Sequence, residues 1–534
     1  MNTKLLSFLL LFSAMAFSQK PKVEKPKLVV GIVVDQMRYD YLYRFYSKYA
    51  AGGFKRMMND GYNCRNNHYH YASTVTGPGH AHIFNGSSPA ISGIVGNEWF
   101  EKNTAASMYV VADSTVNVVG TGSASAGKMS PRNMKVTSIT DQLRIATQFK
   151  SKVIGIAFKD RGAILPAGHT GLAYWYDAGS GNWITSDYYQ KTLPDWVKTF
   201  NDKKLPQQYI TKMWDPLQPL TNYTETEDDD QPYEATISGE PKAVFPHKVT
   251  MGSLAQSYFG NELTKNFALA AIDSEKMGMG NETDFLTVSF STPDYTGHAF
   301  GAQSKEIEDV YLRLDKNMEE ILLHLDKKLG IGNYTVFLSA DHGVAEIPAF
   351  LKKHNVPAGL FLGGELEKKA EAALVAKFGE GKYVINSDNY QLYLNKVLLG
   401  QKNITIDQVT AVLKNEFAAI EGVYNVINLS EGDVNEVPSY FRDKLTNIYN
   451  PKRSGEVMIL VEPAWFQGYT KGTTHGTMYA YDTHVPLLFY GFGINKGENL
   501  NRTYISDIAP TIAMLLKILE PNGTIGQPVT SALK

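Results

Sequence analysis

Residues 28–35 read Leu-Val-Val-Gly-Ile-Val-Val-Asp, an uninterrupted apolar run that ends in an acid. A run of this kind is typical of a strand buried on both faces of a parallel sheet. Similar runs recur at 153–158, 285–290, 334–338 and 485–490. Helical patterns lie between them, and in residues 305–329 the apolar positions follow helical spacing. The alternation predicts an α/β core, with a mostly parallel central sheet and helices on both faces.

Two stretches interrupt this alternation. Residues 171–249 are rich in Trp, Tyr, Asp and Pro. Residues 344–466 carry helix and strand signals of their own, including helical patterns at 365–378 and 406–417. We interpret both stretches as insertions, the second as a small α/β cap, in one catalytic domain that spans residues 28–534.

The N-terminus has the features of a secretory signal. Lys4 is followed by an apolar run from Leu5 to Phe17 that ends in small residues, and the run is too short for a membrane span of roughly 20 residues. We predict a signal peptide at residues 1–18, a Lys/Pro-rich linker at 19–27, and a periplasmic or secreted protein. The single cysteine, Cys64, excludes an internal disulfide, and no cysteine stands at the cleavage site of a lipoprotein.

The overall composition excludes other classes of protein. With 43% hydrophobic and 20% charged residues, the 534-residue chain has enough apolar material for a large core. The formal net charge of -2 gives no electrostatic reason to expect a nucleic-acid partner. No feature of the sequence indicates a membrane span in the mature chain or an obligate protein partner.

Charged and metal-ligating residues follow four of the predicted strands. In an open parallel sheet, ligands bind beyond the carboxyl ends of the strands. Each group alone could be a helix cap or a polar turn, but their joint position at four strand ends indicates a site. The groups are Asp35, Lys159-Asp160-Arg161, Asp294 with His298, and Asp341-His342.

Carboxylate and imidazole without thiolate form a ligand set for zinc or manganese. Two adjacent ions need about three protein ligands each, and the strand ends supply Asp35, Asp294, His298, Asp341 and His342. His475, next to Gly476, is the best remaining histidine, and His484 is its competitor. For His80 a structural role is favoured over ligation.

Thr76 begins the segment Thr76-Gly77-Pro78-Gly79, which places its hydroxyl at the start of a helix. Backbone N–H groups and the helix dipole favour a phosphate-like anion there. A metal ion on the threonine oxygen makes it a nucleophile at neutral pH. The alternative is a simple N-cap threonine.

Taken together with Asn97, these motifs resemble the alkaline phosphatase superfamily, and within it the phosphate-irrepressible alkaline phosphatases. These are periplasmic monoesterases with a threonine nucleophile and two zinc ions, and the resemblance extends from about Leu28 to the last strands. It implies one zinc on Asp294, His298 and His475, and a second on Asp35, Asp341, His342 and the Thr76 oxygen. It also implies phosphate contacts from Asn97, Lys159 and Arg161. Because Thr76 and Lys159 depart from the branch with a serine nucleophile and a third, magnesium site, no Mg²⁺ site is expected.

The expected function is hydrolysis of small-molecule phosphate monoesters by double displacement, through a phosphothreonine and with release of inorganic phosphate. The two metal ions would stabilise both apical oxygens of the transferred phosphoryl group. A phosphodiesterase or nucleotide pyrophosphatase on the same scaffold is the main alternative, and a non-catalytic metal- or phosphate-binding protein is another. A sulfatase would need a Cys-x-Pro-x-Arg type of motif, which the residues after Cys64 do not form.

Overall fold

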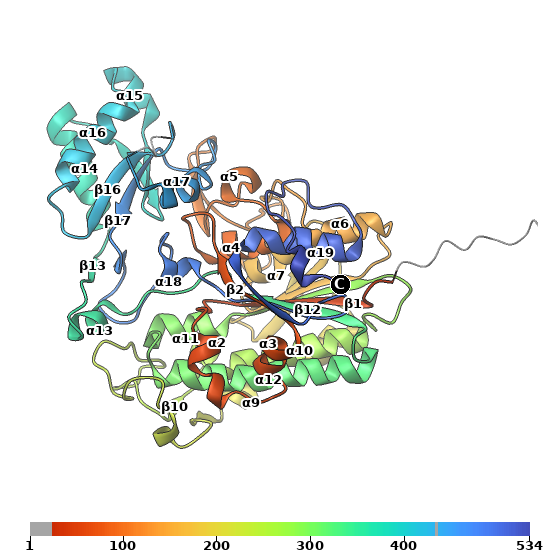
Figure 1. Ribbon diagram of the computed structural model, residues 1–534. Helices are drawn as coiled ribbons and strands as arrows, with labels where there is room; N and C mark the ends of the chain where they lie inside the picture. The colour runs from red at the N-terminus through yellow and green to blue at the C-terminus, as the bar shows by residue number, and fades with distance from the viewer. Residues whose placement is uncertain (1–23, 433–435) are drawn as a thin grey trace, which may run out of the picture.

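A ten-stranded sheet forms the centre of the computed structural model, which describes residues 24–432 and 436–534 (Figure 1). The predicted signal peptide, and all but the end of the predicted linker, lie outside these residues. The strand order is β20-β2-β19-β12-β1-β11-β6-β7-β8-β5. The strand bounds are β20 (Gly497–Tyr504), β2 (Tyr62–His68), β19 (Leu487–Gly491), β12 (Tyr334–Ser339), β1 (Leu28–Val34), β11 (Asp284–Phe290), β6 (Val153–Ala157), β7 (Leu172–Asp177), β8 (Asn182–Ser186) and β5 (Val118–Val119).

The five central strands are parallel. β1 pairs with β12 on one side and with β11 on the other, and β11, β6 and β7 continue the parallel order. The strands on either side of this group, β19 and β8, run antiparallel to it. The last predicted run, 485–490, therefore forms an antiparallel strand, and the predicted mostly parallel α/β class is confirmed.

Helices cover both faces of the sheet, as predicted (Figure 1). One face carries α2 (Tyr41–Arg44), α3 (Phe54–Asp60), α10 (Tyr258–Ser274), α11 (Thr292–Phe300) and α12 (Lys305–Leu329). The other carries α4 (Thr76–Asn85), α6 (Ile139–Ala146), α7 (Asp160–Ala167) and α19 (Ile508–Leu516).

Helix α12 coincides with the helix predicted at 305–329. It begins where the Ser304 side chain accepts a hydrogen bond from Ile307 N, and it ends at Gly330, whose φ is 87°. Within the described ranges no helix is long and apolar enough to cross a membrane.

The stretch at 171–249 contributes partly to the main sheet and partly to elements outside it. Its first part supplies β7 and β8 of the main sheet, because β7 extends the parallel order beyond β6. The remainder forms α8 (Asp195–Asp202), α9 (Leu205–Tyr209), β9 (Met213–Trp214) and β10 (His247–Lys248), and α9 and β10 lie on the face covered by α12 (Figure 1).

Residues 359–432 and 436–467, here called the cap, form a separate layer beside the main sheet (Figure 1). Four of its strands make a sheet of order β14-β15-β17-β16 with a hydrophobic cluster of its own, which includes Leu374, Leu413 and Val457. The helices predicted at 365–378 and 406–417 are α14 and α16. The bounds are β13 (Gly359–Phe361), α14 (Glu365–Phe378), β14 (Val384–Asp388), β15 (Gln391–Leu394), α15 (Lys396–Lys402), α16 (Ile406–Phe417), β16 (Val423–Asn428), α17 (Ser439–Thr446), β17 (Val457–Val461) and β18 (Trp465–Gln467).

Candidate active site

Three neighbouring parallel strands deliver carboxylates and imidazoles to one edge of the main sheet. Asp35 follows β1, and Asp341 and His342 follow β12; all three are fully buried. β11 leads into α11, where Asp294 lies in the first turn and His298 lies one turn later. The parallel register of the strands brings these ends together, at the edge where ligands bind in open α/β sheets.

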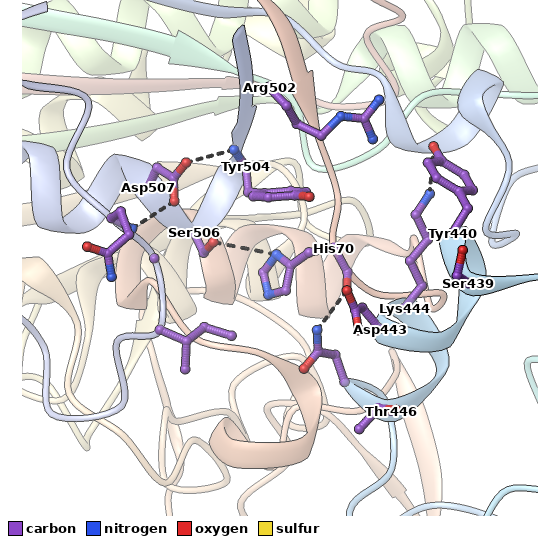
Figure 2. A pocket seen from close by; sticks show the side chains of 14 residues that line it. His70, Ser439, Tyr440, Asp443, Lys444, Thr446, Arg502, Tyr504, Ser506 and Asp507 are labelled. Atoms are coloured by element: carbon purple, nitrogen blue, oxygen red, sulfur yellow. Dashed lines mark hydrogen bonds between the residues drawn. The ribbon is translucent and has the colours of Figure 1, made fainter. Parts of the chain in front are cut away.

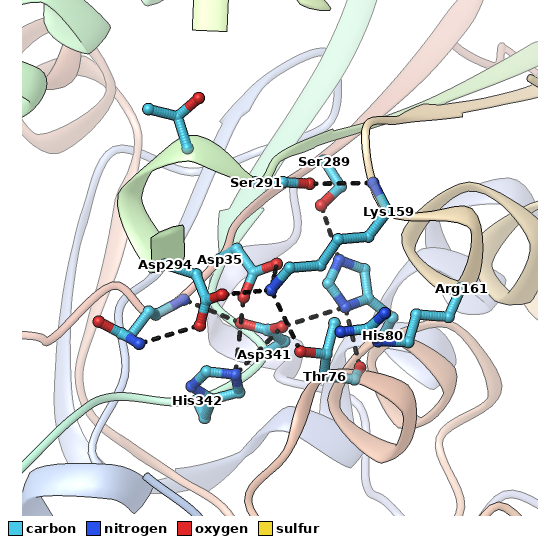
Figure 3. A network of polar contacts seen from close by, with 12 residues as sticks. Asp35, Thr76, His80, Lys159, Arg161, Ser289, Ser291, Asp294, Asp341 and His342 are labelled. Carbon is cyan, nitrogen blue, oxygen red and sulfur yellow. Dashed lines mark hydrogen bonds and ion pairs between the residues drawn. The ribbon is translucent and has the colours of Figure 1, made fainter. Parts of the chain in front are cut away.

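A fourth strand, β6, delivers the positive charge. Lys159 follows this strand at the start of α7 and is 5% exposed. Its Nζ lies 2.7 Å from Asp35 Oδ2, 2.5 Å from Asp294 Oδ2 and 3.4 Å from Thr76 Oγ1 (Figure 3). Lys159 was predicted to contact phosphate, and the structure places its ammonium group between two carboxylates and beside the threonine hydroxyl.

Thr76 is the first residue of α4, as the sequence predicts. The helix approaches the end of β12 closely, since a Cβ on Gly79 would lie 2.2 Å from the carbonyl oxygen of Asp341. Only glycine allows this approach. The glycine after Pro78 therefore brings the N-terminus of α4, the positive end of its dipole, next to the buried carboxylates.

The three predicted histidine ligands share one orientation. The Nδ1 atoms of His298, His342 and His475 lie 2.8, 2.9 and 2.8 Å from the carbonyl oxygens of Thr473, Gly343 and Thr74. A carbonyl only accepts, so each Nδ1 must carry a proton, and in the neutral ring Nε2 then has the lone pair that a metal ion needs. A hydrogen bond of this kind fixes the ring of a metal-ligating histidine.

The Nε2 atoms face the carboxylates. His298 Nε2 and His475 Nε2 lie 3.2 and 3.6 Å from Asp294 Oδ1. His342 Nε2 lies 3.6 Å from Asp35 Oδ1 and 3.5 Å from Asp341 Oδ2. These are the two groups into which the family resemblance divides the ligands.

Buried atoms without hydrogen-bond partners test whether metal ions fit. Among the described residues these atoms include Asp35 Oδ1, Asp341 Oδ2 and His342 Nε2. Buried groups of this kind are normally satisfied by a hydrogen bond or a metal ion. Ligand atoms of Asp294, His298 and His475 lie within 4.8 Å of one another, as do those of Asp35, Asp294 and His342. Carboxylate oxygens and imidazole nitrogens without thiolate suit zinc, so the donor set fits.

His484 and His80 are the two other histidines that the sequence offers as possible metal ligands. His484 stacks on Tyr39 at 4.1 Å between ring centroids, and its Nε2 lies 3.1 Å from Arg65 O. It therefore lies outside the ligand cluster, which contains His475. The Nδ1 of His80 donates to Thr76 O at 3.0 Å, and its Nε2 bonds Ser289 Oγ at 2.7 Å. Both ring nitrogens of His80 are engaged, which fits support of the threonine, and Nδ1 also lies 3.2 Å from Asp341 Oδ2, within a candidate metal group of Asp35, His80 and Asp341.

The surroundings shift the pKa values of Asp35 and Asp294 in opposite directions. Burial and the charge of Asp341 raise the pKa of Asp35 well above its ordinary value. Burial also disfavours the ionised form of Asp294, but His298 and Lys159 outweigh it and hold the pKa of Asp294 well below its ordinary range. Burial and the neighbouring rings of His342 and His298 lower the pKa of His475. Asp35 thus lacks sufficient positive charge nearby, and His475 stays neutral, as a metal ligand must be.

The two remaining predicted residues border the threonine and α7. Asn97 Oδ1 accepts a hydrogen bond from Gly77 N at 2.7 Å, so its amide nitrogen is the group left to donate to a ligand. Arg161 Nη1 lies 3.0 Å from Tyr109 Oη, at the end of β4 (Ala106–Tyr109). Tyr109 in turn donates to Asp160 Oδ1.

The sequence did not single out three residues that hold the site together. Tyr109 orients Arg161. Gln36, next to Asp35, donates to Asp341 Oδ1 from its backbone and to Asp294 Oδ1 from its side chain, at 3.1 and 2.9 Å. Asp482 accepts from Gly476 N and Thr477 N and so fixes the loop after His475. The signal for Gln36 was its position beside a strand-end acid; Tyr109 and Asp482 gave no local signal.

A separate polar cavity of about 550 Å³ lies between α17 and β20 (Figure 2). His70, Lys444 and Arg502 line it. Lys444 Nζ donates to Met478 O at 2.8 Å, so this cation is already engaged within the protein. The cavity contains none of the predicted site residues, and cavity size alone would therefore not have located the site.

The fold and this site define a member of a metal-dependent hydrolase superfamily. The chain belongs to the type I phosphodiesterase / nucleotide pyrophosphatase family, whose profile matches residues 29–485. This confirms the predicted membership of the alkaline phosphatase superfamily.

Full-length relatives support the same placement. The chain is 44% identical to alkaline phosphatase PafA of Elizabethkingia meningoseptica over 98% of both chains. It is 42% identical to alkaline phosphatase PhoV of Synechococcus elongatus over 100% of both. A Myroides odoratus protein named calcium-transporting ATPase is 44% identical over 98% of this chain and 97% of its own. The crystal structure of wild-type PafA superposes with a TM-score of 0.93, at 44% identity, over 96% of this chain and 100% of that one.

Proposed function

We propose that this protein is an alkaline phosphatase, a metal-dependent phosphate monoester hydrolase that forms a phosphothreonine on Thr76 and releases inorganic phosphate. The proposal rests chiefly on one observation. Thr76 Oγ1 lies at a helix N-terminus, 3.4 Å from Lys159 Nζ and beside a buried cluster of carboxylates and imidazoles. Two of the full-length relatives carry the name alkaline phosphatase, which supports the same activity.

Two zinc ions fit the donor set. We assign one to Asp294, His298 and His475, and the other to Asp35, Asp341, His342 and the Thr76 oxygen. When bound, such ions act as Lewis acids that lower the pKa of a hydroxyl and stabilise developing negative charge.

The chain's own groups then do the following. Thr76 gives up its hydroxyl proton to solvent, and Oγ1 forms a bond to phosphorus while the bond to the leaving oxygen breaks in line with it and that oxygen takes up a proton from solvent. Asn97, Lys159 and Arg161 bind the non-bridging oxygens, and the dipole of α4 favours the negative charge that gathers at its N-terminus. Water then attacks the same phosphorus and breaks its bond to Oγ1, which regenerates the threonine and releases phosphate.

The number of free phosphate oxygens favours a monoester over a diester. A monoester dianion leaves three non-bridging oxygens for Asn97, Lys159 and Arg161 to bind. A diester has one charge less and carries a second substituent in place of an oxygen that Arg161 could bind.

A further comparison supports the roles of the four phosphate-contacting residues. A solved variant of PafA, 43% identical to this chain, is substituted at a threonine, an asparagine, a lysine and an arginine. These four follow one another in the same order and at the same separations as Thr76, Asn97, Lys159 and Arg161. We therefore propose that these residues act as the nucleophile and the phosphate contacts of this chain.

A phosphodiesterase is the second candidate, since the family takes its name from that activity. The test is to measure kcat/KM of the zinc-loaded protein for one aryl phosphate monoester, for the matching diester and for ATP, whose terminal phosphoryl group is also a dianion. We expect the monoester to be the better substrate by orders of magnitude. A preference for the diester would overturn the monoesterase assignment, and no turnover of any of them would favour a binding protein.

We also propose that residues 1–18 are removed as a signal peptide and that the mature protein is periplasmic or secreted. N-terminal sequencing of the protein purified from its native host tests this. We expect the chain to begin after Ser18, and an intact Met1 would refute the proposal.

A further inference from the structure

The turn between β14 and β15 in the cap has an unusual backbone. Its two residues, Asn389 and Tyr390, have φ values of 45° and 64°. A hairpin turn with positive φ at both positions normally carries Asn-Gly, because a bulky side chain is disfavoured there. Tyr390 is held in place nonetheless. Its carbonyl accepts from Ile459 N at 2.9 Å and its hydroxyl accepts from Gln467 N at 3.0 Å.

The side chain of Asn389 lies between two loops of the main domain. Its Nδ2 donates to Asp388 Oδ2 at 2.9 Å. Both atoms lie against Gly96, because a Cβ on that glycine would be 2.9 Å from Asp388 Oδ2 and 3.1 Å from Asn389 Nδ2. The other end of the amide, Oδ1, lies 3.8 Å from the corresponding position on Gly476.

Both glycines adjoin residues of the candidate site. Gly96 precedes Asn97, and Gly476 follows His475. The carbonyl of Gly96 lies 3.1 Å from the Cβ position of Gly77, whose N–H is bound by Asn97 Oδ1. The cap therefore packs, through one asparagine, against the segment from which Asn97 reaches the start of α4.

We propose that Asn389 is a positioning residue for Asn97, and that the cap thereby contributes to phosphate binding. By filling the space against Gly96, the Asn389–Asp388 pair fixes the backbone that carries Asn97. Asn389 itself does not touch the phosphoryl group and acts through Asn97. This inference rests on the proposed function, which makes Asn97 a phosphate contact.

Asparagine suits this position for two physical reasons. It tolerates positive φ better than most side chains, and its amide can donate to Asp388 while it presents its oxygen to the other loop. Glycine would keep the backbone and lose the contact. Aspartate at position 389 would keep the size of the side chain but would place a second carboxylate beside that of Asp388.

The test measures binding of inorganic phosphate to the zinc-loaded, full-length protein by isothermal titration calorimetry, which requires no turnover. Asn389→Gly should weaken phosphate binding by roughly 3- to 10-fold, the size of coupling seen between residues in contact. Asn389→Asp should weaken it at least as much. The matched control is Asn403→Gly, the same change at another cap asparagine with positive φ (54°), and it should have no effect.

A double-mutant cycle shows whether the effect passes through Asn97. In an Asn97→Ala background, Asn389→Gly should change the Kd for phosphate by less than about 2-fold. Equal losses in both backgrounds, or no loss in either Asn389 variant, would overturn the inference. If Asn97→Ala leaves phosphate binding unchanged, the proposed role of Asn97 fails and this inference fails with it. If Asn97→Ala weakens binding and Asn389→Gly does not, only the inference fails. Zinc content and thermal melting of each variant show whether the fold is kept.

Discussion

Arg161→Ala should lower hydrolysis of the monoester much more than hydrolysis of the diester, because the arginine binds an oxygen that only the monoester leaves free. The side chain sits at the start of α7, where Tyr109 Oη lies 3.0 Å from Nη1. A planar guanidinium can donate two parallel hydrogen bonds to phosphate, and a hydrogen bond to a charged group contributes about 1.5–3 kcal/mol. We therefore expect a loss of about 3–4 kcal/mol of transition-state stabilisation, or roughly 10²–10³ in kcat/KM for an aryl monoester.

Tyr109→Phe provides a graded version of the same experiment. It keeps the guanidinium and removes the hydroxyl that orients it, a hydrogen bond that contributes about 1 kcal/mol. The expected loss is roughly 5-fold on the monoester. Because tyrosine acts through arginine, the Tyr109→Phe loss should largely disappear in the Arg161→Ala background.

The assay compares kcat/KM for one aryl monoester and the matching diester, with equal zinc content in every variant. Diester hydrolysis should fall by less than about 10-fold in Arg161→Ala, because the second substituent replaces an oxygen that the arginine would bind. Equal losses on both substrates would refute this reasoning. The reasoning would also be refuted if Tyr109→Phe lowered kcat/KM for the monoester by the same factor in the Arg161→Ala background as in the wild type.

Three further predictions address the nucleophile, the metals and the cap. Thr76→Ser should retain substantial activity and Thr76→Ala should lose nearly all of it, with the trapped phosphoryl group found by mass spectrometry on Thr76 alone. Chelation should abolish activity and lower Tm, zinc should restore both, and elemental analysis should find about two ions per chain; full activity in metal-free protein would contradict the two-metal site. Burial, with the charge of Glu98, raises the pKa of Asp388 to about 7. Its protonated form therefore stabilises the fold below about pH 4, and this contribution is lost as pH rises through 7. Asp388→Asn should accordingly raise Tm at pH 8 but not at pH 4, and a Tm gain that is the same at both pH values would exclude this cause.

Local patterns in the sequence are enough to predict the fold class and the chemical character of the candidate site. Apolar runs such as 28–34 can only be buried on both faces, and the helical spacing at 305–329 predicts a helix with the observed bounds. The rule that parallel strands present their carboxyl ends at one edge then places Asp35, Asp294 and Asp341 together. These inferences need only local pattern and one rule of topology.

The tertiary structure decided what depends on contacts between distant segments. It places His475 in the cluster of candidate ligands, and His484 against Tyr39, because loop conformation and not residue type brings a ring to a site. It shows Tyr109 beside Arg161, although 52 residues separate them. It also brings the cap turn at Asn389 against Gly96, although the cap has its own sheet and core. A local sequence pattern carries no signal for such pairs, since each residue alone is compatible with an ordinary turn, and only the packed loops bring them together.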